Sequence, residues 1–339
     1  MAAREHRRNA LRYPGPIRPR RAATTLLIAT LFLAAGCSSG SGASSGRSAG
    51  TSTAGSSPLA SPGAHTASKN ASVGRPAKLF VVVLENHSAR NAINGMPGLA
   101  AAAARYGRAT RSFALTHPSL PNYLAIAGGS TFGVHDDNLP AAHPLGGSSV
   151  FGQVLAAGKV AKTYAEGMTT PCQVRSGGRY AVKHNPWVYF TSRTERAGCR
   201  RYDVPAGTPT KGALHHDIAG RTLPTFGLLI PDLCNDAHDC SLSTADRWLH
   251  RWLGPLLASR DFRIGRLAIV VTFDEDHHDA NNSILTAVLH QRLHGRRVAE
   301  RVDHDALSHA VSRLVGARPL RNAAKAPNLL AAFGLASAS

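Results

Sequence analysis

The sequence predicts an α/β fold with a largely parallel central sheet and helices on both of its faces. Three continuous apolar runs, rich in β-branched residues, lie at 78–85 (KLFVVVLE), 225–230 and 267–273 (LAIVVTF). Such runs are typical of strands buried on both faces of a sheet. Helical segments alternate with them along the chain, which is the order of crossover connections between parallel strands.

The other elements follow from local patterns. Residues 244–259 carry Trp248, Trp252 and Leu256 at helical spacing, and residues 98–106 are rich in alanine. These features predict amphipathic helices. Further helices are expected at 122–127, 149–157 and 303–315, and shorter strands at 159–165 and 284–289.

The N-terminus has the features of an export signal. Seven arginines precede an apolar run at 26–35 (LLIATLFLAA), which ends at Gly36-Cys37. The run is too short to span a membrane, which takes about 20 apolar residues. Small residues before a cysteine are what a lipoprotein signal peptidase cleaves, so 1–36 is expected to be a lipoprotein signal peptide and Cys37 a lipidation site. The alternative is an ordinary secretory signal with a chance cysteine; the chain is exported in both cases, either lipid-anchored at the cell surface or secreted.

Residues 37–75 are mostly Ser, Gly, Ala, Thr and Pro, with almost no large apolar side chain. Such a segment cannot bury enough surface to offset its ordering entropy, so a disordered, flexible tether is expected. The remaining residues, 76–339, have a length that is normal for one α/β domain.

The charge balance is strongly basic. The whole chain carries a formal charge of +19, and removing the seven arginines and one glutamate of 1–36 leaves 32 basic and 19 acidic residues, a net +13. A positive field of this size favours anionic partners, such as phosphorylated small molecules or lipid head groups. The alternative is an arginine-rich composition without functional meaning. No nucleic-acid partner is expected, because no basic stripe is interleaved with aromatic residues.

Four cysteines remain once Cys37 is set aside: Cys172, Cys199, Cys234 and Cys240. They allow three pairings. Proximity in sequence favours Cys172–Cys199 and Cys234–Cys240, in the oxidising compartment that export implies. A zinc cluster is the competing interpretation, and the absence of any CxxC pair disfavours it.

Acidic residues follow two of the predicted buried strands. The first run ends in Glu85-Asn86, and the run at 267–273 is followed by Asp274-Glu275. Ligands of α/β sheets collect at the carboxyl ends of strands, and acids after buried apolar runs are costly unless a cation holds them. Oxygen ligands at two strand ends therefore favour a hard divalent metal. The alternative is that these acids are helix N-caps or solvated loop residues.

Ser119 lies between two prolines, just before a predicted helix. A rigid turn there would expose its hydroxyl at a helix N-terminus, where backbone N–H groups favour a phosphate. The alternative is that Ser119 is only an N-cap.

Several motifs occur in family order, among them LENHS (84–88), THPSLPNYLAIAGGSTFGV (116–134), YAEGMTTPC (164–172), KHNPWVYF (183–190) and TFDED (272–276). They resemble the bacterial phosphoesterase family of acid phosphatases and phospholipases C, a branch of the alkaline phosphatase superfamily. Within this family, the chain length and the THPSLPNYLA motif most resemble those of the short secreted acid phosphatases of the mycobacterial type. The resemblance spans about 79–333 and implies an alkaline-phosphatase-like fold, with 76–339 as the phosphoesterase domain.

The resemblance also implies roles for individual residues. It makes Ser119 the catalytic nucleophile and Asn122 a substrate-binding residue that helps hold the phosphoryl group. His184 and His238 match histidines of the phosphate pocket, where they would bind substrate and assist catalysis, and His304 matches a histidine of the C-terminal stretch. The cofactor it implies is a divalent ion (Mg, Ca, Mn or Zn), with the metal ligands Glu85, Asn86, Asp274 and Glu275. The four cysteines match positions that are disulfide-bonded in relatives.

Two departures from the family pattern stand out. Many relatives carry a histidine after the asparagine pair at 281–282, where this chain has Ser283. If that histidine is a metal ligand elsewhere, this chain holds one ion where others hold two. His277 and His278 replace small or acidic residues, and exposed loop histidines without a function are the more common case.

The activity implied is that of an exported, metal-dependent phosphomonoesterase acting through a phosphoserine. Histidines with an ordinary pKa of about 6.5 would favour mildly acidic pH. The alternatives are a phospholipase C-type phosphodiesterase and a catalytically inactive, anion-binding surface lipoprotein. A sulfatase is disfavoured, because the chain has no C-x-P-x-R or S-x-P-x-R sequence.

Overall fold

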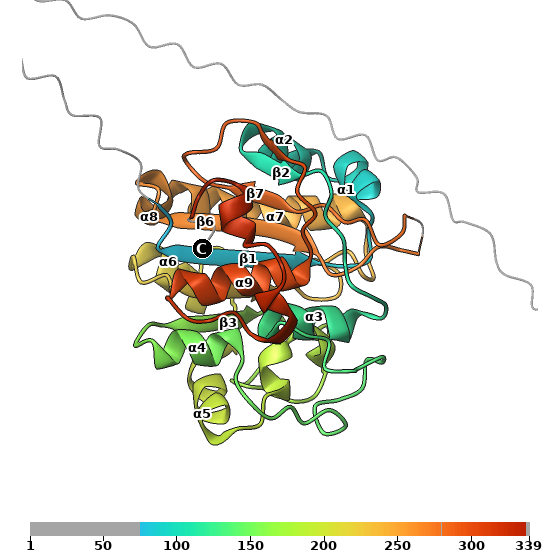
Figure 1. Cartoon of the computed structure of the whole chain (residues 1–339), viewed down its shortest axis with the longest axis vertical. Helices are drawn as coiled ribbons and strands as arrows, with labels where there is room; N and C mark the ends of the chain where they lie inside the picture. The colour runs from blue at the N-terminus through green and yellow to red at the C-terminus, as the bar shows by residue number, and fades with distance from the viewer. Residues whose placement is uncertain (1–74, 279, 337–339) are drawn as a thin grey trace, which may run out of the picture. The chain divides into compact units, whose positions relative to one another are not determined.

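The computed structural model describes residues 75–278 and 280–336. The predicted signal peptide (1–36), Cys37 and the predicted tether up to residue 74 lie outside the described residues, so these predictions stay untested. Figure 1 shows the described residues in colour.

The central sheet has eight strands in the order β4-β3-β5-β1-β6-β7-β2-β8. β1 pairs in parallel with both β5 and β6, while β7 runs antiparallel to β6 and β2. The predicted, largely parallel sheet is therefore confirmed. The strands are β1 (Lys78–Leu84), β2 (Gly107–Ala109), β3 (Ala161–Ala165), β4 (Asp203–Pro205), β5 (Phe226–Ile230), β6 (Leu267–Phe273), β7 (Ala287–Leu289) and β8 (Arg296–Val298).

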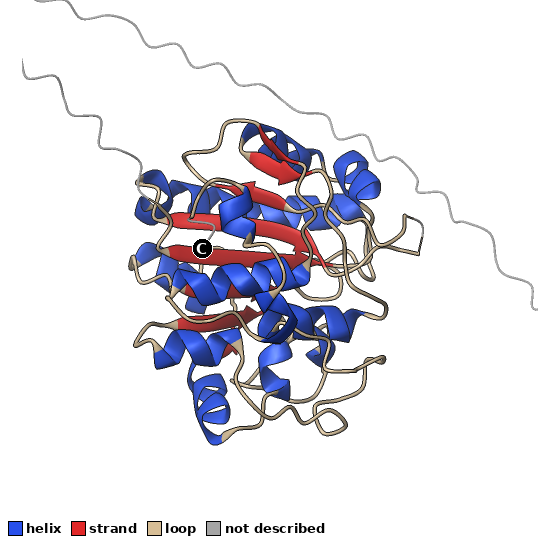
Figure 2. Cartoon of the chain, viewed as in Figure 1, coloured by secondary structure: helices blue, strands red, loops and turns tan. Residues whose placement is uncertain are grey.

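Helices cover both faces of this sheet (Figure 2). On one face α9 packs against α3 and α4, and on the other α7 packs against α1, α2 and α8 (Figure 1). The helices are α1 (Ala89–Gly95), α2 (Pro97–Arg105), α3 (Ser119–Gly128), α4 (Val150–Ala156), α5 (Arg193–Tyr202), α6 (Ala213–Ala219), α7 (Leu242–Ala258), α8 (Arg260–Arg263), α9 (His304–Leu314) and α10 (Leu329–Ala332). Three 3₁₀ turns complete the set among the described residues: η1 (Val182–His184), η2 (Pro186–Tyr189) and η3 (Arg321–Ala324).

Three adjacent strands, β5, β1 and β6, form the core of the domain. Every residue of β5 and β6 is buried, as is every residue of β1 after Lys78. This burial explains why their sequences are continuously apolar rather than alternating. No helix in the described part of the chain is both long enough and apolar enough to cross a bilayer.

Two predicted boundaries differ from the structure. The helix expected from residue 122 begins at Ser119, because Pro121 lies in its first turn, where a missing N–H costs nothing. The strand expected at 284–289 is reduced to β7, and Ile284 makes only an isolated bridge to Ser88. The short elements α1, α5, α6, β2, β4 and β8 had no periodic apolar pattern to reveal them.

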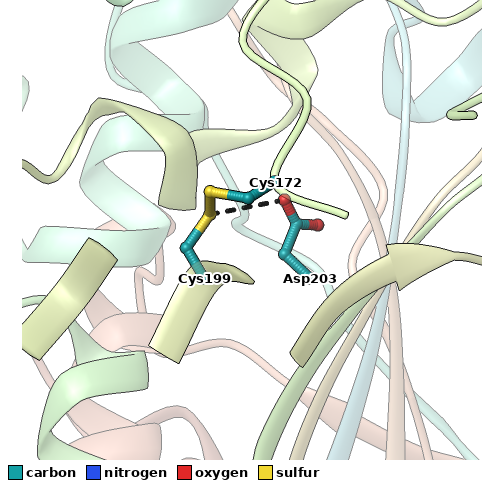
Figure 3. A group of neighbouring side chains, drawn as sticks. All are labelled: Cys172, Cys199 and Asp203. Atoms are coloured by element: carbon teal, nitrogen blue, oxygen red, sulfur yellow. Dashed lines mark hydrogen bonds between the residues drawn. A yellow bond between two sulfur atoms is a disulfide. The ribbon is translucent and has the colours of Figure 1, made fainter. Parts of the chain in front are cut away.

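Both disulfides favoured by the sequence are present. Cys172–Cys199 ties the loop after β3 to α5, and Cys234–Cys240 closes a short loop after β5. Asp203 lies beside the first bridge, with Oδ2 3.6 Å from Cys199 Sγ (Figure 3). Because all four sulfurs are bonded in pairs, none has a thiol proton to donate or a free thiolate for a metal. The zinc-cluster alternative is therefore wrong.

Candidate active site

The acidic residues after β1 and β6 meet at one edge of the sheet. Asp274 Oδ1 accepts a hydrogen bond of 3.0 Å from the backbone N–H of Asn86, and Asn86 has a left-handed backbone with φ 57°. Asparagine is among the few residues that adopt this conformation readily. Glu85 and Asp274 are fully buried, and Glu275 is 5% exposed. The pairing of β1 with β6 thus places the predicted metal ligands side by side.

The first turn of α3 lies against Glu85. Ser119 Oγ donates to Glu85 Oε2 at 3.1 Å, and Tyr123 OH donates to Glu85 Oε1 at 2.6 Å. Residues four apart share one face of a helix, so one turn of α3 supplies both donors. Tyr123 was missed from the sequence, although its spacing from Ser119 was the signal that could have revealed it.

His184 is clamped between two carboxylates. Its Nε2 lies 3.3 Å from Glu85 Oε1, its Nδ1 lies 3.3 Å from Asp236 Oδ2, and its ring stacks on Tyr123 at 5.1 Å. Burial alone would lower the pKa of His184, but the two carboxylates outweigh it and raise that pKa to about 10. Burial likewise works to raise the pKa of Glu85, whereas His184 and the bond from Tyr123 bring it down to about 2.

The charge state of His184 corrects one expectation. A histidine with its ordinary pKa would gain charge only at mildly acidic pH, whereas His184 stays an imidazolium through neutrality because Glu85 and Asp236 surround it. His184 is therefore not the group that would confer an acidic optimum.

His238 lies at the mouth of the site, inside the Cys234–Cys240 loop. Its ring centroid is 6.0 Å from that of His184, and its side chain is 30% exposed. Its backbone N–H donates to Asp236 Oδ1 at 2.7 Å, so Asp236 joins the two histidines. The structure thus places His238 beside the predicted pocket, open to solvent.

Asn122 is engaged by the protein itself. Its Oδ1 accepts from the N–H groups of Leu115 and Thr116, at 3.0 and 3.3 Å. Its Nδ2 donates to Thr116 O at 2.8 Å and to Glu275 Oε2 at 3.2 Å. Asn122 therefore braces the loop that leads to Ser119 and contacts a predicted metal ligand, while its phosphate contact stays a prediction.

A second network, missed from the sequence, surrounds Asp276. Its carboxylate accepts from the backbone N–H groups of His278, Ala280 and Asn282, which folds the loop after β6. His117 Nδ1 lies 3.2 Å from Glu275 Oε2, and its Nε2 lies 3.3 Å from Asp276 Oδ1. The ring of His117 also stacks on His278 at 3.8 Å. The position of His117, two residues before Ser119, was the only signal.

Asp137 and Lys183 form a third missed pair. Lys183 Nζ donates to Asp137 Oδ2 at 2.7 Å, and Asp137 Oδ1 accepts from the backbone N–H of Leu120 at 2.9 Å. Burial would lower the pKa of Lys183, but Asp137 and the site carboxylates raise it. Lys183 therefore stays charged, and its partner Asp137 links it to the first turn of α3.

The carboxylates fit a hard divalent cation. Asp274 Oδ2 is buried without a hydrogen-bond partner. Burial, followed by repulsion from Glu85 and Glu275, raises the pKa of Asp274 well above its usual range, and burial with Glu85 raises that of Glu275 to about 8. Crowded carboxylates with an oxygen left over are the ligand set that such ions favour. His304 lies behind this set and bonds through Nε2 to Asp274 O at 2.6 Å, so it supports the loop.

Comparison with known proteins agrees with this geometry. The family model described as the Phosphoesterase family matches residues 77–284. A phosphatidylinositol-3-phosphatase of Mycobacterium tuberculosis is 30% identical over 263 residues, which cover 75% of this chain and 82% of that protein. An acid phosphatase of Aspergillus fumigatus is 31% identical over 53% of this chain, and the match spans only 41% of that longer protein.

Solved structures share the fold. A candidate sulfatase of Bacteroides fragilis superposes with a TM-score of 0.51 at 12% identity, covering 82% of this chain and 81% of that one. A Vibrio parahaemolyticus protein of the alkaline phosphatase superfamily has a TM-score of 0.47 at 12% identity, with 72% and 67% covered. The described residues form the predicted α/β sheet with helices on both faces, and the Bacteroides structure shares this fold.

Proposed function

The chain belongs to the Phosphoesterase family and is a phosphoric ester hydrolase, and from that premise we propose an exported, metal-dependent phosphomonoesterase that works through a phosphoserine at Ser119. One observation carries the proposal. Ser119 begins α3 with its hydroxyl 3.1 Å from Glu85, in the same site as Asp274 and Glu275. A nucleophile candidate, a helix N-terminus and oxygen ligands therefore converge.

The basic groups of the site would bind and orient the phosphate. Lys183, paired with Asp137, and the imidazolium of His184, 3.3 Å from Glu85 Oε1, offer positive charge to a dianion. Phosphate groups are stabilised at helix N-termini, and a phosphate at the start of α3 would lie beside Asp137, which accepts from the N–H of Leu120. Glu85, Asn86, Asp274 and Glu275 are the residues that would hold the divalent ion. When bound, such an ion supplies Lewis acidity, which lowers the pKa of a hydroxyl and withdraws charge from phosphoryl oxygens.

The protein's own groups account for the bond changes. Ser119 Oγ bonds to phosphorus as the ester P–O bond breaks, and the hydroxyl proton leaves along the hydrogen bond to Glu85 Oε2. His238, half-open at the mouth, gives a proton to the leaving alkoxide. Water, deprotonated by the same histidine, then attacks phosphorus from the opposite side. The Ser119 Oγ–P bond breaks, phosphate leaves, and Ser119 Oγ takes its proton back from Glu85 Oε2.

The substrate class that we propose for this chain is a phosphorylated inositol lipid, because the mycobacterial relative is named as a phosphatidylinositol-3-phosphatase. Export is supported by the sequence at 26–37 and by two disulfides, which persist in oxidising compartments. Lipid anchoring rests on Cys37 alone.

Hydrolysis assays test the reaction class. Full-length protein, expressed in an oxidising compartment, is given aryl phosphate monoester and diester substrates across pH, with and without chelator, beside Ser119→Ala. Chelator-sensitive monoester hydrolysis that Ser119→Ala abolishes is the expected result. Hydrolysis of the diester alone would favour the phospholipase C-type alternative. A folded protein inactive on both, with each candidate ion added, would favour the anion-binding lipoprotein.

A further inference from the structure

Apolar side chains are exposed close to the active site. Leu139 is 44% exposed and Val174 is 39% exposed, and they are two of the four large apolar side chains that the described residues leave exposed. Both line one surface hollow of about 210 Å³, together with Pro140, Pro144, Arg175 and Arg196. Exposed apolar groups that gather in one place mark interaction surfaces more often than scattered ones do.

One wall of this hollow is linked to α3 by a hydrogen bond. Leu139 follows Asp137 by two residues, and Asp137 Oδ1 accepts from the N–H of Leu120, the residue after Ser119. Tyr189 OH donates to the carbonyl of Asn138 at 2.9 Å and holds this part of the loop in place. A molecule lying in the hollow would therefore lie beside the entrance to Ser119.

The opposite wall is held by the first disulfide. Val174 and Arg175 come two and three residues after Cys172, while Arg196 comes three residues before Cys199 on α5. Figure 3 shows the bridge that joins these two segments. The hollow is thus a covalently fixed part of the fold.

The adjoining helix offers only positive charge to solvent. Arg193, Arg196 and Arg200 lie at positions i, i+3 and i+7 of α5, which places them on one face. The one acidic residue of this helix, Glu195, is buried and accepts hydrogen bonds from Ser149 Oγ and Trp187 Nε1. The arginines are therefore not neutralised by an exposed acid of their own helix.

We propose that the hollow and this arginine face form a docking surface for an anionic phospholipid membrane, which presents a lipid-linked phosphate monoester to Ser119. The inference rests on the proposed function and names the physical form of its substrate. Leu139 and Val174 enter the apolar boundary of the bilayer, while Arg196 and Arg200 pair with lipid phosphates. A volume of about 210 Å³ is below the ~300 Å³ of pockets that enclose a ligand, so the surface suits an interface.

Two double variants of the full-length chain test the proposal: Leu139→Ser with Val174→Ser, and Arg196→Gln with Arg200→Gln. The matched controls are Val160→Ser with Ile264→Ser, the other exposed apolar pair, and Arg296→Gln with Arg297→Gln on β8. The probes are phosphatidylcholine vesicles with and without phosphatidylserine, carrying a long-chain phosphatidylinositol monophosphate, and a soluble aryl phosphate. Sedimentation measures vesicle binding, and phosphate release measures turnover.

Both test variants are expected to lose at least about tenfold in binding and turnover on the anionic vesicles. Each surface arginine contributes about a fivefold factor to membrane binding, and Leu139 and Val174 contribute by burying their apolar side chains in the bilayer boundary. Their turnover of aryl phosphate should stay unchanged, and both controls should match the wild type. Wild-type vesicle binding by the test variants, or equal losses in the controls, would overturn the docking surface. An equal loss on aryl phosphate would also overturn it. If the wild type hydrolyses no aryl phosphate yet binds vesicles through these residues, the proposed function fails and the docking surface stands.

Discussion

Ser119 and Glu85, 34 residues apart in the chain, are joined by a buried hydrogen bond of 3.1 Å from Ser119 Oγ to Glu85 Oε2. The bond links the start of α3 to the end of β1, and Tyr123 completes it from the same helix turn. The nucleophile candidate is therefore held by an acid that is itself a predicted metal ligand. The position of the Ser119 hydroxyl therefore depends on the charged state of Glu85.

Tyr123→Phe should weaken the apparent affinity for the divalent ion about tenfold, because it removes the donor that orients Glu85 Oε1. Hydrolysis should recover in part at saturating metal. Titration of activity against metal concentration measures the change. Tyr164→Phe is the matched control, since its hydroxyl donates to Asp217 at the same 2.6 Å elsewhere in the fold. Equal effects of the two substitutions would contradict a role in orienting the ligand.

Lys183→Gln should raise the KM for aryl phosphate about tenfold with a smaller effect on kcat, because a positive charge beside the start of α3 attracts the dianion. Lys183→Arg should restore most of the loss. Steady-state kinetics and inhibition by inorganic phosphate measure both. Lys162→Gln is the control, because it breaks a similar pair with Asp217 away from the site. An unchanged KM in Lys183→Gln would rule out this role.

Asp274→Asn should abolish chelator-sensitive hydrolysis and yet stabilise the metal-free protein by about 1 kcal/mol or more. Burial and repulsion from Glu85 and Glu275 raise the pKa of the Asp274 carboxyl, so folding without metal requires the uptake of a proton, which an amide does not need. Denaturant unfolding in chelator measures the free energy. Asp217→Asn is the contrasting variant. It should lower the free energy of unfolding, because Asp217 is paired with Lys162. A metal-free Asp274→Asn less stable than the wild type would argue against charge crowding.

Asp203→Asn should change how stability depends on pH. Burial raises the pKa of Asp203 to about 7, against the effect of Asn185, which donates to both carboxylate oxygens. The folded protein then keeps this proton up to about pH 7, whereas the unfolded chain loses it near pH 3.9. The folded state binds more protons between these two pH values. The contribution of Asp203 to the free energy of unfolding is therefore greatest below about pH 4 and is lost as pH rises through 7.

Denaturant unfolding from about pH 4.5 to 8 measures that contribution. Over this pH range, the free energy of unfolding of the wild type should fall by on the order of 3 kcal/mol more than that of Asp203→Asn. Glu300→Gln, a change at an exposed acid, should keep the wild-type slope. Parallel slopes for the wild type and Asp203→Asn would show that Asp203 is ionised throughout.

The sheet and the acids that follow it could be predicted because both signals are local. A strand buried on two faces is apolar at every position, so Glu85 and Asp274 stand out as the residues that end such runs. Pairing of β1 with β6 then brings them together without further information. Both disulfides were also predictable, since nearest-neighbour pairing closes short loops.

The electrostatics of the site could not be predicted, because they depend on contacts between distant loops. Asp137 and Lys183 are 46 residues apart, and neither lies in a periodic segment. The charge of His184 is set by Glu85 and by Asp236, which reach it from two different strand ends. Residue type alone gave the ordinary histidine pKa, and only the fold shows why it does not apply.

Chemical trapping of the intermediate tests the central claim most directly. Full-length wild type is mixed with an aryl phosphate monoester and divalent ion, quenched in acid during turnover, and digested for mass spectrometry of the peptide that contains Ser119. The account predicts one phosphoryl group on Ser119, absent in chelator and in Ser119→Ala. Steady turnover without phosphoserine, or undiminished turnover in Ser119→Ala, would contradict it.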